Sequence, residues 1–413
     1  MKRENIVETE DVELLDKKSG KWDFLFAKGG FDIPFFVLVM ALLTVGLVML
    51  FSASYAYAYH YNSGSYHYIK NQLIFAGIGL VVMFLFSKIN YRVWKPLAPI
   101  IFGISIVLLL VVFAMPAYEG QWHRWIYIGG FSFQPSEIAK FAVVIFFGYL
   151  VEHFGSNIGK VKSFIWFMVS LGFVCGLIIA EPHLSGTLVI AALGIIIMIV
   201  GGVKKRWLAI LFLIGGAALA IYIFGFKGIG YIGDRLQGWL DKDFDPLGVR
   251  WQTNQSLYAI GSGGLFGVGL GNSKQKYLYV SEPQNDFIFA IVCEELGFVG
   301  ACVIMLLFMA LVWRGCVIAT RSPDKFGMLT AVGLVAQIGI QAALNIAVVT
   351  DTIPNTGVSL PFFSAGGTSL VMIMAQMGVV LSVSRGRSAE NLRDAMDDKL
   401  KDSKLRKFFL LWS

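Results

Sequence analysis

The chain has 413 residues, of which 56% are hydrophobic and only 15% are charged, and its mean hydropathy is +0.69. These values exclude a soluble domain of ordinary composition and indicate a membrane protein. The formal net charge is +7, but the basic residues gather in short loops and in the tail that begins at Arg385. A nucleic-acid partner is therefore not needed to explain the charge. The four cysteines fall within apolar runs, so no disulfide framework is expected.

Apolar runs recur along the chain, each close to the length of about 20 residues that a membrane-spanning helix needs. The sequence predicts an all-α membrane protein with ten transmembrane helices, at residues 33–54, 69–87, 96–115, 136–152, 163–180, 184–202, 207–226, 286–313, 327–350 and 365–384. The first 30 residues mix acids and bases without an apolar core, so we expect a cytosolic tail and no cleaved signal peptide. The membrane domain is expected to cover 31–386, and a basic cytosolic tail to follow at 387–413.

Lysine and arginine residues in short loops predict the orientation, because they accumulate on the cytosolic side of a membrane. The loops after the second, fourth, sixth and eighth predicted helices hold Lys88, Arg92, Lys95, Lys160, Lys162, Lys204, Lys205, Arg206, Arg314, Arg321 and Lys325. The short loops on the opposite side hold only Lys70 and Arg124. Both termini are therefore predicted to be cytosolic.

The connection between the seventh and eighth predicted helices, residues 227–285, is much longer than the others and is predicted to lie outside the cell. Loops of this length are usually functional. Within it, residues 249–260 are expected to form a short amphipathic helix on the membrane surface, with Trp251 and Tyr258 at the interface. The glycine-rich stretch 261–271 follows no strand, so we interpret it as close backbone packing and not as a phosphate-binding loop.

A second outer loop, residues 118–134, is rich in aromatic and basic side chains: Trp122, His123, Arg124, Trp125 and Tyr127. Aromatic residues of this kind anchor proteins at the membrane interface. Contact with a substrate would explain the same composition. The sequence leaves both interpretations open.

Charged residues within predicted helices are candidates for function, because burying a charge in a membrane is unfavourable. Even the scales with the lowest values give a cost of about 2.5–3.5 kcal/mol for inserting a charged residue at the centre of a spanning helix. They are Glu137, Lys140, Glu152, Asp286, Glu294, Glu295 and Asp351. Asp286 opens the eighth predicted helix, where it is either an N-cap or a functional carboxylate at the outer surface. Glu137 and Lys140 are three residues apart and are either an internal ion pair or catalytic. Adjacent Glu294 and Glu295 point in different directions, so at least one needs a polar partner or a watery cavity.

Three long motifs carry a resemblance to a known family. They are FQPSEIAKF at 133–141, RWQTNQSLYAIGSGGLFGVGLGNSKQKYLYVSEPQNDFIFAIVCEELGFVG at 250–300 and PNTGVSLPFFSAGGTSL at 354–370. With these motifs the chain resembles the SEDS family (shape, elongation, division and sporulation) over nearly all of the ten-helix region. Residues 269–290 are more similar to the division and sporulation branch (FtsW and SpoVE types) than to the elongation branch (RodA type).

The resemblance implies a peptidoglycan glycosyltransferase of the bacterial plasma membrane, which polymerises lipid II on the outer face during cell division or sporulation. Its implied partner is a class B penicillin-binding protein, and other division proteins are further candidates. The resemblance also implies that Asp286 is the essential carboxylate and that the substrate-binding residues include Lys140, Glu137, Arg250, Ser369 and Gln284. The sequence departs from the family at His183, where an Asp is usual, and at Ala365, where a Tyr is usual.

The implied reaction is the attack of a sugar hydroxyl on an anomeric carbon whose leaving group is undecaprenyl pyrophosphate. Inversion at that carbon needs one carboxylate as general base, and Asp286 fits this role. Lys140, Arg250 or a divalent cation, Mg²⁺ or Mn²⁺, would supply positive charge to the pyrophosphate, and Lys140 is the preferred candidate. The sequence requires no cofactor.

Two alternatives to the enzyme stay open. One is a flippase for lipid II, which the charges of Glu294 and Glu295 suit. The other is a non-catalytic scaffold for a penicillin-binding protein, which the departures at His183 and Ala365 favour. We prefer the enzyme because the strongest motif lies in an outer loop and at a helix end, whereas transport sites tend to lie near the membrane midplane.

Overall fold

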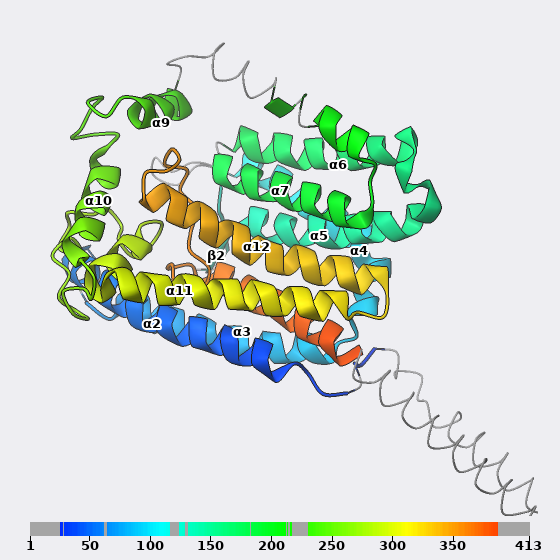
Figure 1. Ribbon diagram of the computed structural model, residues 1–413, viewed down its shortest axis with the longest axis horizontal. Coiled ribbons are helices and arrows are strands. Elements are labelled where there is room, and N and C mark those ends of the chain that lie inside the picture. Colours follow the sequence, from blue (N-terminus) through cyan, green and yellow to red (C-terminus); the bar gives the residue numbers. More distant parts are fainter. Residues whose placement is uncertain are drawn as a thin grey trace, which may run out of the picture.

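A computed structural model describes residues 25–386 with the exception of residues 28, 62–63, 116–123, 129–130, 182, 212, 214 and 217–229. Long helices lie side by side and form one bundle (Figure 1). Within the described ranges, nine helices are long and apolar enough to cross a membrane. They are α2 (Ile33–Tyr61), α3 (His67–Lys88), α4 (Trp94–Ala114), α5 (Pro135–Phe154), α6 (Val161–Ala180), α7 (Leu184–Gly201), α11 (Ile288–Thr320), α12 (Lys325–Val349) and a last helix, Gly367–Gly386.

The prediction of an all-α, multi-pass membrane protein is confirmed, and each of the nine helices matches a predicted span. The seventh predicted span, 207–226, lies largely outside the described residues, so the count of ten stays a prediction. The two tails fall outside them as well. Shorter elements connect the long helices: η1 (Tyr91–Val93), β1 (Ile126–Ile128), β2 (Phe131–Phe133), η2 (Gly155–Gly159), α9 (Gly230–Leu240) and α10 (Trp251–Gly263).

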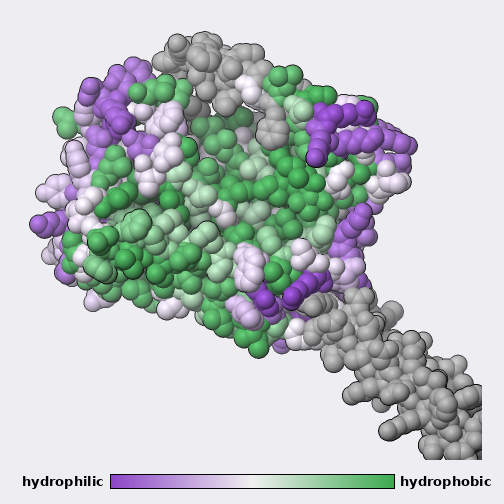
Figure 2. All heavy atoms as spheres, in the orientation of Figure 1, coloured by the Kyte–Doolittle hydropathy of each residue, from purple (hydrophilic) through white to green (hydrophobic). Residues whose placement is uncertain are grey.

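Helix α5 lies at the centre of its half of the bundle, in contact with α4, α6, α7 and α12. Most of its side chains are buried, and aromatic rings fill its contacts: Phe146 stacks on Phe102 of α4 at a centroid distance of 4.2 Å. The hydrocarbon core of a membrane holds no water that could bond to the backbone. A spanning segment must therefore pair its own N–H and C=O groups, which a continuous helix does. The surface of the bundle also suits a membrane: Figure 2 shows hydrophobic side chains over its middle and hydrophilic ones mainly toward its ends.

The loops with the predicted cytosolic lysines and arginines meet at one end of the bundle. Arg92, after α3, pairs with Asp324 at the start of α12 at 2.8 Å, and Lys95 pairs with Glu152 of α5 at 2.9 Å. The indole Nε1 of Trp207 donates to the carbonyl of Gly159 at 3.2 Å. We call this end the basic end. The excess of lysine and arginine at this end supports the expectation that it faces the cytosol. That orientation stays a prediction.

The eighth span begins and ends later than predicted. Asp286 does not open the helix and does not cap it: α11 begins at Ile288, its N-cap is Phe287, and no side chain caps it. The turn before the helix instead places Asp286 beside Gly357, where an added Cβ would lie 3.1 Å from its Oδ2. The helix also contains a break at Gly297, whose φ of 69° and ψ of −172° are not helical.

The glycine-rich stretch explains this break. Backbone amides of Val268 and Gly269 donate to the carbonyls of Glu294 and Glu295 at 3.0 and 3.1 Å. In return, Phe298 and Val299 donate to the carbonyls of Gly264 and Leu265 at 2.9 and 3.1 Å. A Cβ on Gly297 would lie 2.2 Å from the amide nitrogen of Gly267, so only glycines permit this approach. The prediction of close backbone packing is confirmed.

The helix expected at 249–260 is present as α10, and its location at the membrane surface stays a prediction. It packs against α11 and α12: Gly263 touches the backbone of Cys293, and the Ser256 hydroxyl donates to the carbonyl of Val349 at 2.8 Å. Tyr258 is exposed, whereas Trp251 donates its indole Nε1 to the carbonyl of Tyr279 at 2.9 Å. Small residues on one face of α10 allow this packing, which the aromatic residues Trp251 and Tyr258 did not indicate in the sequence.

Candidate functional site

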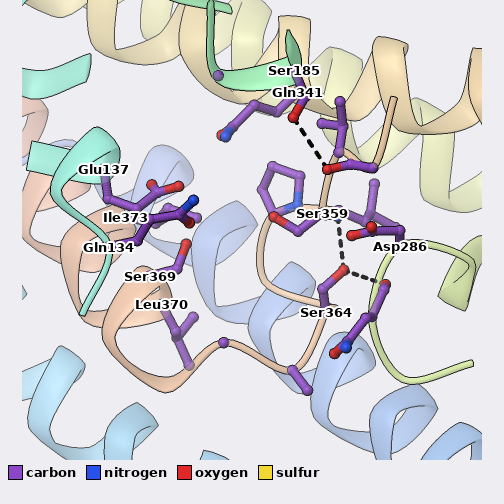
Figure 3. Close-up of a pocket in the computed structure, with 18 of the residues that line it drawn as sticks. Gln134, Glu137, Ser185, Asp286, Gln341, Ser359, Ser364, Ser369, Leu370 and Ile373 are labelled. Carbon is purple, nitrogen blue, oxygen red and sulfur yellow. Dashed lines mark hydrogen bonds between the residues drawn. The ribbon is translucent and has the colours of Figure 1, made fainter. Parts of the chain in front are cut away.

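A polar cavity of about 790 Å³ opens at the end of the bundle opposite the basic end. Its walls come from the hairpin β1–β2, the first turns of α5 and α7, the turn before α11, and the segment 357–373. Figure 3 shows Glu137, Gln134 and Ser369 on one side of this cavity, and Asp286 and Ser359 on the other. The site therefore joins segments that are far apart in the sequence.

Asp286 lines the cavity from the turn before α11 and is partly buried. Its backbone carbonyl accepts a hydrogen bond from Nδ2 of Asn345 at 2.7 Å, which fixes the turn. Burial is the main reason that the pKa of the Asp286 carboxyl is raised to about 6, and the charge of nearby Glu282 acts in the same direction. Arg235 and Arg124 oppose the shift. A carboxyl with this pKa is a much better base than an ordinary aspartate, yet it is ionised at neutral pH.

Glu137 and Lys140 lie on the opposite wall, on the first turns of α5. Lys140 Nζ donates to Glu137 Oε1 at 2.6 Å, and both side chains are nearly inaccessible. The predicted ion pair is thus present, and it lines the cavity as well, so the two interpretations of these residues do not exclude each other. Oε2 of Glu137 has no hydrogen-bond partner within the described part of the chain.

The two departures from the family both lie in the cavity wall, as does Ser369. Nδ1 of His183, at the start of α7, lies 3.3 Å from Nε2 of Gln134. Burial, with the charges of Arg124 and Lys140, lowers the pKa of His183 to about 3, so its imidazole is neutral. At the two positions where the resemblance implies an acidic and an aromatic side chain, the cavity wall therefore carries a neutral imidazole and a methyl group.

Part of the second outer loop also lines the cavity. Arg124, Trp125 and Tyr127 contribute to its wall, and Arg124 Nε donates to the backbone carbonyl of Glu181 at 3.1 Å. This placement favours substrate contact over simple anchoring for these three residues. Trp122 and His123 lie outside the described residues. The hairpin β1–β2, which pairs Ile126 with Phe133, was not predicted, because its strands are only three residues long.

Two predicted substrate-binding residues do not line the cavity. Arg250 lies behind it, where its Nη2 pairs with Oδ2 of Asp351 at 3.0 Å and its Nη1 donates to the carbonyl of Gly238. Gln284 is buried, and its carbonyl accepts from the amide of Ala365 at 2.8 Å. Their proposed contact with substrate stays a prediction, and their observed contacts are with other parts of the chain.

Glu294 and Glu295 both have polar partners, as was predicted for at least one of them. Glu295 pairs with Lys276 at 3.0 Å and accepts from the Ser52 hydroxyl of α2 at 2.7 Å. Glu294 accepts from the Ser273 hydroxyl and from the amide of Lys274, the latter at 2.9 Å. These carboxylates hold the end of the long loop against α11 and α2.

Several cavity residues were missed by the sequence analysis: Ser185, Glu282, Gln341 and Ser359. Ser359 lies within the motif 354–370 and Ser185 is two residues from His183, so both positions carried an available signal. Gln341 is one of two glutamines in the apolar helix α12, and its polarity was the available signal. Glu282 has a φ of 49° and Phe362 one of 66°, and such strained non-glycine residues cluster at functional sites.

Within the part of the chain that the structure describes, no group of three or more His, Cys, Asp and Glu side chains could hold a metal ion. The cationic side chains on the cavity wall there are Arg124 and Lys140. A divalent cation stays a prediction.

Together, the fold and the site define a multi-pass membrane protein with a polar cavity that places a carboxylate of raised pKa opposite a lysine–glutamate pair. The sequence profile of the FtsW/RodA/SpoVE family, described as "Cell cycle protein", matches residues 33–389. The chain belongs to this family.

Named relatives and solved structures agree with this assignment. The chain is 40% identical to "Stage V sporulation protein E" of Bacillus subtilis, over 86% of this chain and 97% of the relative. It is 35% identical to "Probable peptidoglycan glycosyltransferase FtsW" of Trichlorobacter lovleyi, over 87% and 95%. A structure described as "Structural coordination of polymerization and crosslinking by a peptidoglycan synthase complex" matches with a TM-score of 0.72 and 26% identity, over 86% and 98%. The rod shape determining protein RodA of Thermus thermophilus matches with a TM-score of 0.65 and 27% identity, over 86% and 97%.

Proposed function

We propose that the chain is a peptidoglycan glycosyltransferase that polymerises lipid II at this cavity, on the outer face of the bacterial plasma membrane, in cell division or sporulation. The observation that carries the proposal is the position of Asp286, a carboxylate of raised pKa in a polar cavity of about 790 Å³. Family membership and the names of the relatives support the activity. A class B penicillin-binding protein is the proposed partner that cross-links the product.

Asp286 acts as the general base in this reaction. It takes the proton of the acceptor sugar hydroxyl while that oxygen forms a bond to the anomeric carbon of the donor. The bond from this carbon to the pyrophosphate oxygen breaks, and undecaprenyl pyrophosphate leaves with the electron pair. One base and a direct displacement invert the anomeric carbon.

Lys140 and Arg124 supply positive charge for the pyrophosphate. Stabilisation of developing charge by fixed groups is often the largest catalytic contribution, and it is strongest where water is excluded. Figure 3 shows Glu137 on the wall opposite Asp286, and Glu137 Oε1 accepts from Lys140 Nζ at 2.6 Å and so fixes the ammonium group. Lys140 keeps its place as the preferred candidate, and Arg124 joins it because both line the cavity.

The flippase alternative drew its support from Glu294 and Glu295. Both are bonded to the long loop, Glu295 is also bonded to Ser52 of α2, and neither carboxylate lines the cavity. No specific observation among the described residues favours transport over polymerisation.

The test is lipid II polymerisation by the purified full chain, with and without its class B penicillin-binding protein. Asp286→Asn keeps the shape of the side chain and removes the base, so glycan synthesis should fall at least 100-fold while the protein stays folded. Asp243→Asn is the matched control, because Asp243 is exposed in the long loop, and it should polymerise like the wild type. Polymerisation by Asp286→Asn at the wild-type rate would contradict the proposal.

A further inference from the structure

Arg250 and Arg235 lie behind the cavity in a cluster that we call the arginine clamp: Arg235, Trp239, Arg250, Asp351 and Asn355. Arg250 is the N-cap residue of α10, and its guanidinium connects the carboxylate of Asp351, just after α12, with the carbonyl of Gly238 in α9. The side chain of Arg250 is 5% exposed and that of Asp351 is 14% exposed. A buried pair of this kind is costly to break, because the remaining charge is left without a partner.

Helix α9 adds two contacts to the same segment. Trp239 Nε1 donates to the carbonyl of Asp351 at 3.1 Å, and Arg235 Nη1 donates to the carbonyl of Asn355 at 2.7 Å and to its Oδ1 at 3.1 Å. Asp351 has a φ of 56°, a strained conformation that persists only where the surroundings enforce it. The clamp therefore fixes the chain between Asp351 and Asn355.

This fixed segment leads directly to Asp286. Oδ1 of Asn355 accepts from the amide of Gly357 at 3.2 Å, and Gly357 lies so close to Asp286 that an added Cβ would be 3.1 Å from its Oδ2. Asn345 Nδ2 donates both to the carbonyl of Asp286 at 2.7 Å and to that of Val358 at 2.6 Å. The Asp286 carboxylate thus rests against Gly357, and Asn345 connects the backbone of Asp286 to that of Val358.

We propose that Arg250 and Arg235 are positioning residues: through Asp351 and Asn355 they hold Gly357 against Asp286 and so fix the direction of its carboxylate in the cavity. The inference rests on the proposed function. It assigns Arg250 a role without contact to the pyrophosphate. A displacement of a reacting group by about 1 Å can cost a factor of about 100 in rate, so a clamp remote from the substrate is expected to change kcat.

The first test is a double-mutant cycle with Arg250→Gln, Asp351→Asn and the double variant, measured as kcat and KM for lipid II with the full chain and its partner. Each single variant should lower kcat about tenfold or more and change KM less than about twofold. Because the two residues act as one unit, the double variant should be no slower than the worse single variant. A raised KM with an unchanged kcat would show that Arg250 binds substrate, and multiplied effects in the double variant would show independent roles. Either result overturns the proposal.

The pH profile separates positioning from a loss of folded protein. The charged groups that act on Asp286 are Glu282, Arg235 and Arg124. Arg250→Gln leaves all three in place but lets water reach the carboxylate, which lowers the pKa of Asp286 toward its ordinary value. The acid limb of the kcat profile should move to lower pH. A limb at the wild-type position, together with a lower kcat, would contradict the clamp.

The last test does not depend on activity. Amide hydrogen exchange of residues 353–360 should become faster in Arg250→Gln and in Asp351→Asn, while exchange in α5 stays unchanged. Arg321→Gln is the matched control, because Arg321 is exposed at the basic end and its change should leave residues 353–360 protected. Unchanged exchange in both clamp variants would overturn the inference even if the wild type polymerises lipid II. A wild type without polymerase activity would instead count against the proposed function alone.

Discussion

Asp286 and Glu295 lie close together in sequence, on either side of the first turns of α11, yet their carboxylates are held in opposite ways. Glu295 is fully buried and bonded to Lys276, Ser52 and the amide of Ser273. Asp286 faces a polar cavity, where burial raises its pKa to about 6 and its partners act mainly through its backbone carbonyl. A carboxylate inside a membrane protein is costly, so it is either satisfied by bonds or kept for function. Here one short segment contains both kinds.

The largest effect is expected when the hydrogen-bonded carboxylate of Glu295 is removed. Glu295→Gln leaves Lys276 buried without its counter-charge, so the free energy of unfolding should fall by about 3 kcal/mol. Denaturant unfolding of the purified protein in detergent measures it. Asp243→Asn, on the exposed part of the long loop, should unfold like the wild type. Equal stability of Glu295→Gln and the wild type would show that the network does not stabilise the fold.

The next largest effect is expected at the break in α11, because the break determines where the long loop contacts this helix. Gly297→Ala adds a Cβ that would lie 2.2 Å from the amide nitrogen of Gly267 and forces alanine into a φ of 69°. The loss of stability should be about 2 kcal/mol, from strain and overpacking together. An unfolding midpoint like that of the wild type would contradict the observed packing.

Gly357→Ala should affect the site more than the fold. Its Cβ would lie 3.1 Å from Oδ2 of Asp286, and we expect about a tenfold loss of kcat, equivalent to about 1.4 kcal/mol. Gly202→Ala is the matched control, since Gly202 also has a positive φ of 89° but nothing lies within 4 Å of an added Cβ. Similar losses of activity in both variants would show that the effect comes from backbone strain alone.

Glu282→Gln should have the smallest effect. It tests how the charge of Glu282 acts on the pKa of Asp286. The charge of Glu282 raises the pKa of Asp286, so its removal lowers that pKa and moves the acid limb of the polymerisation rate to lower pH. The rate below about pH 6 should therefore exceed that of the wild type. A shift of the limb toward higher pH would contradict the assigned direction.

Much of the fold could be predicted from the sequence, because a membrane-spanning helix is specified by the length and polarity of one segment. Among the residues that the structure describes, nine helices match their predicted spans. The break at Gly297 and the start of α11 at Ile288 could not be predicted, because both depend on backbone contacts with segments far away in the sequence. The same holds for the hairpin β1–β2, whose three-residue strands carry almost no periodic signal.

Charges in apolar runs indicated Asp286, Glu137 and Lys140 from the sequence, and the family resemblance added Ser369. Asp286, Glu137, Lys140 and Ser369 line one cavity. The resemblance implied Arg250 as well, and its charge suits a pyrophosphate, but its guanidinium faces Asp351 and Gly238. Residue type reveals that a buried charge needs a partner, and only the fold reveals whether that partner is substrate or protein.

The most direct test of the central claim is the rate of lipid II polymerisation by the purified full chain as a function of pH. A protonated carboxyl cannot accept the proton of the acceptor hydroxyl, so the rate should be half-maximal near pH 6 and fall as the pH decreases further. In Asp286→Asn the residual rate should lose this acid limb. A wild-type rate that stays constant from about pH 5 to about pH 8, or an unchanged limb in Asp286→Asn, would contradict the assignment of Asp286 as the base.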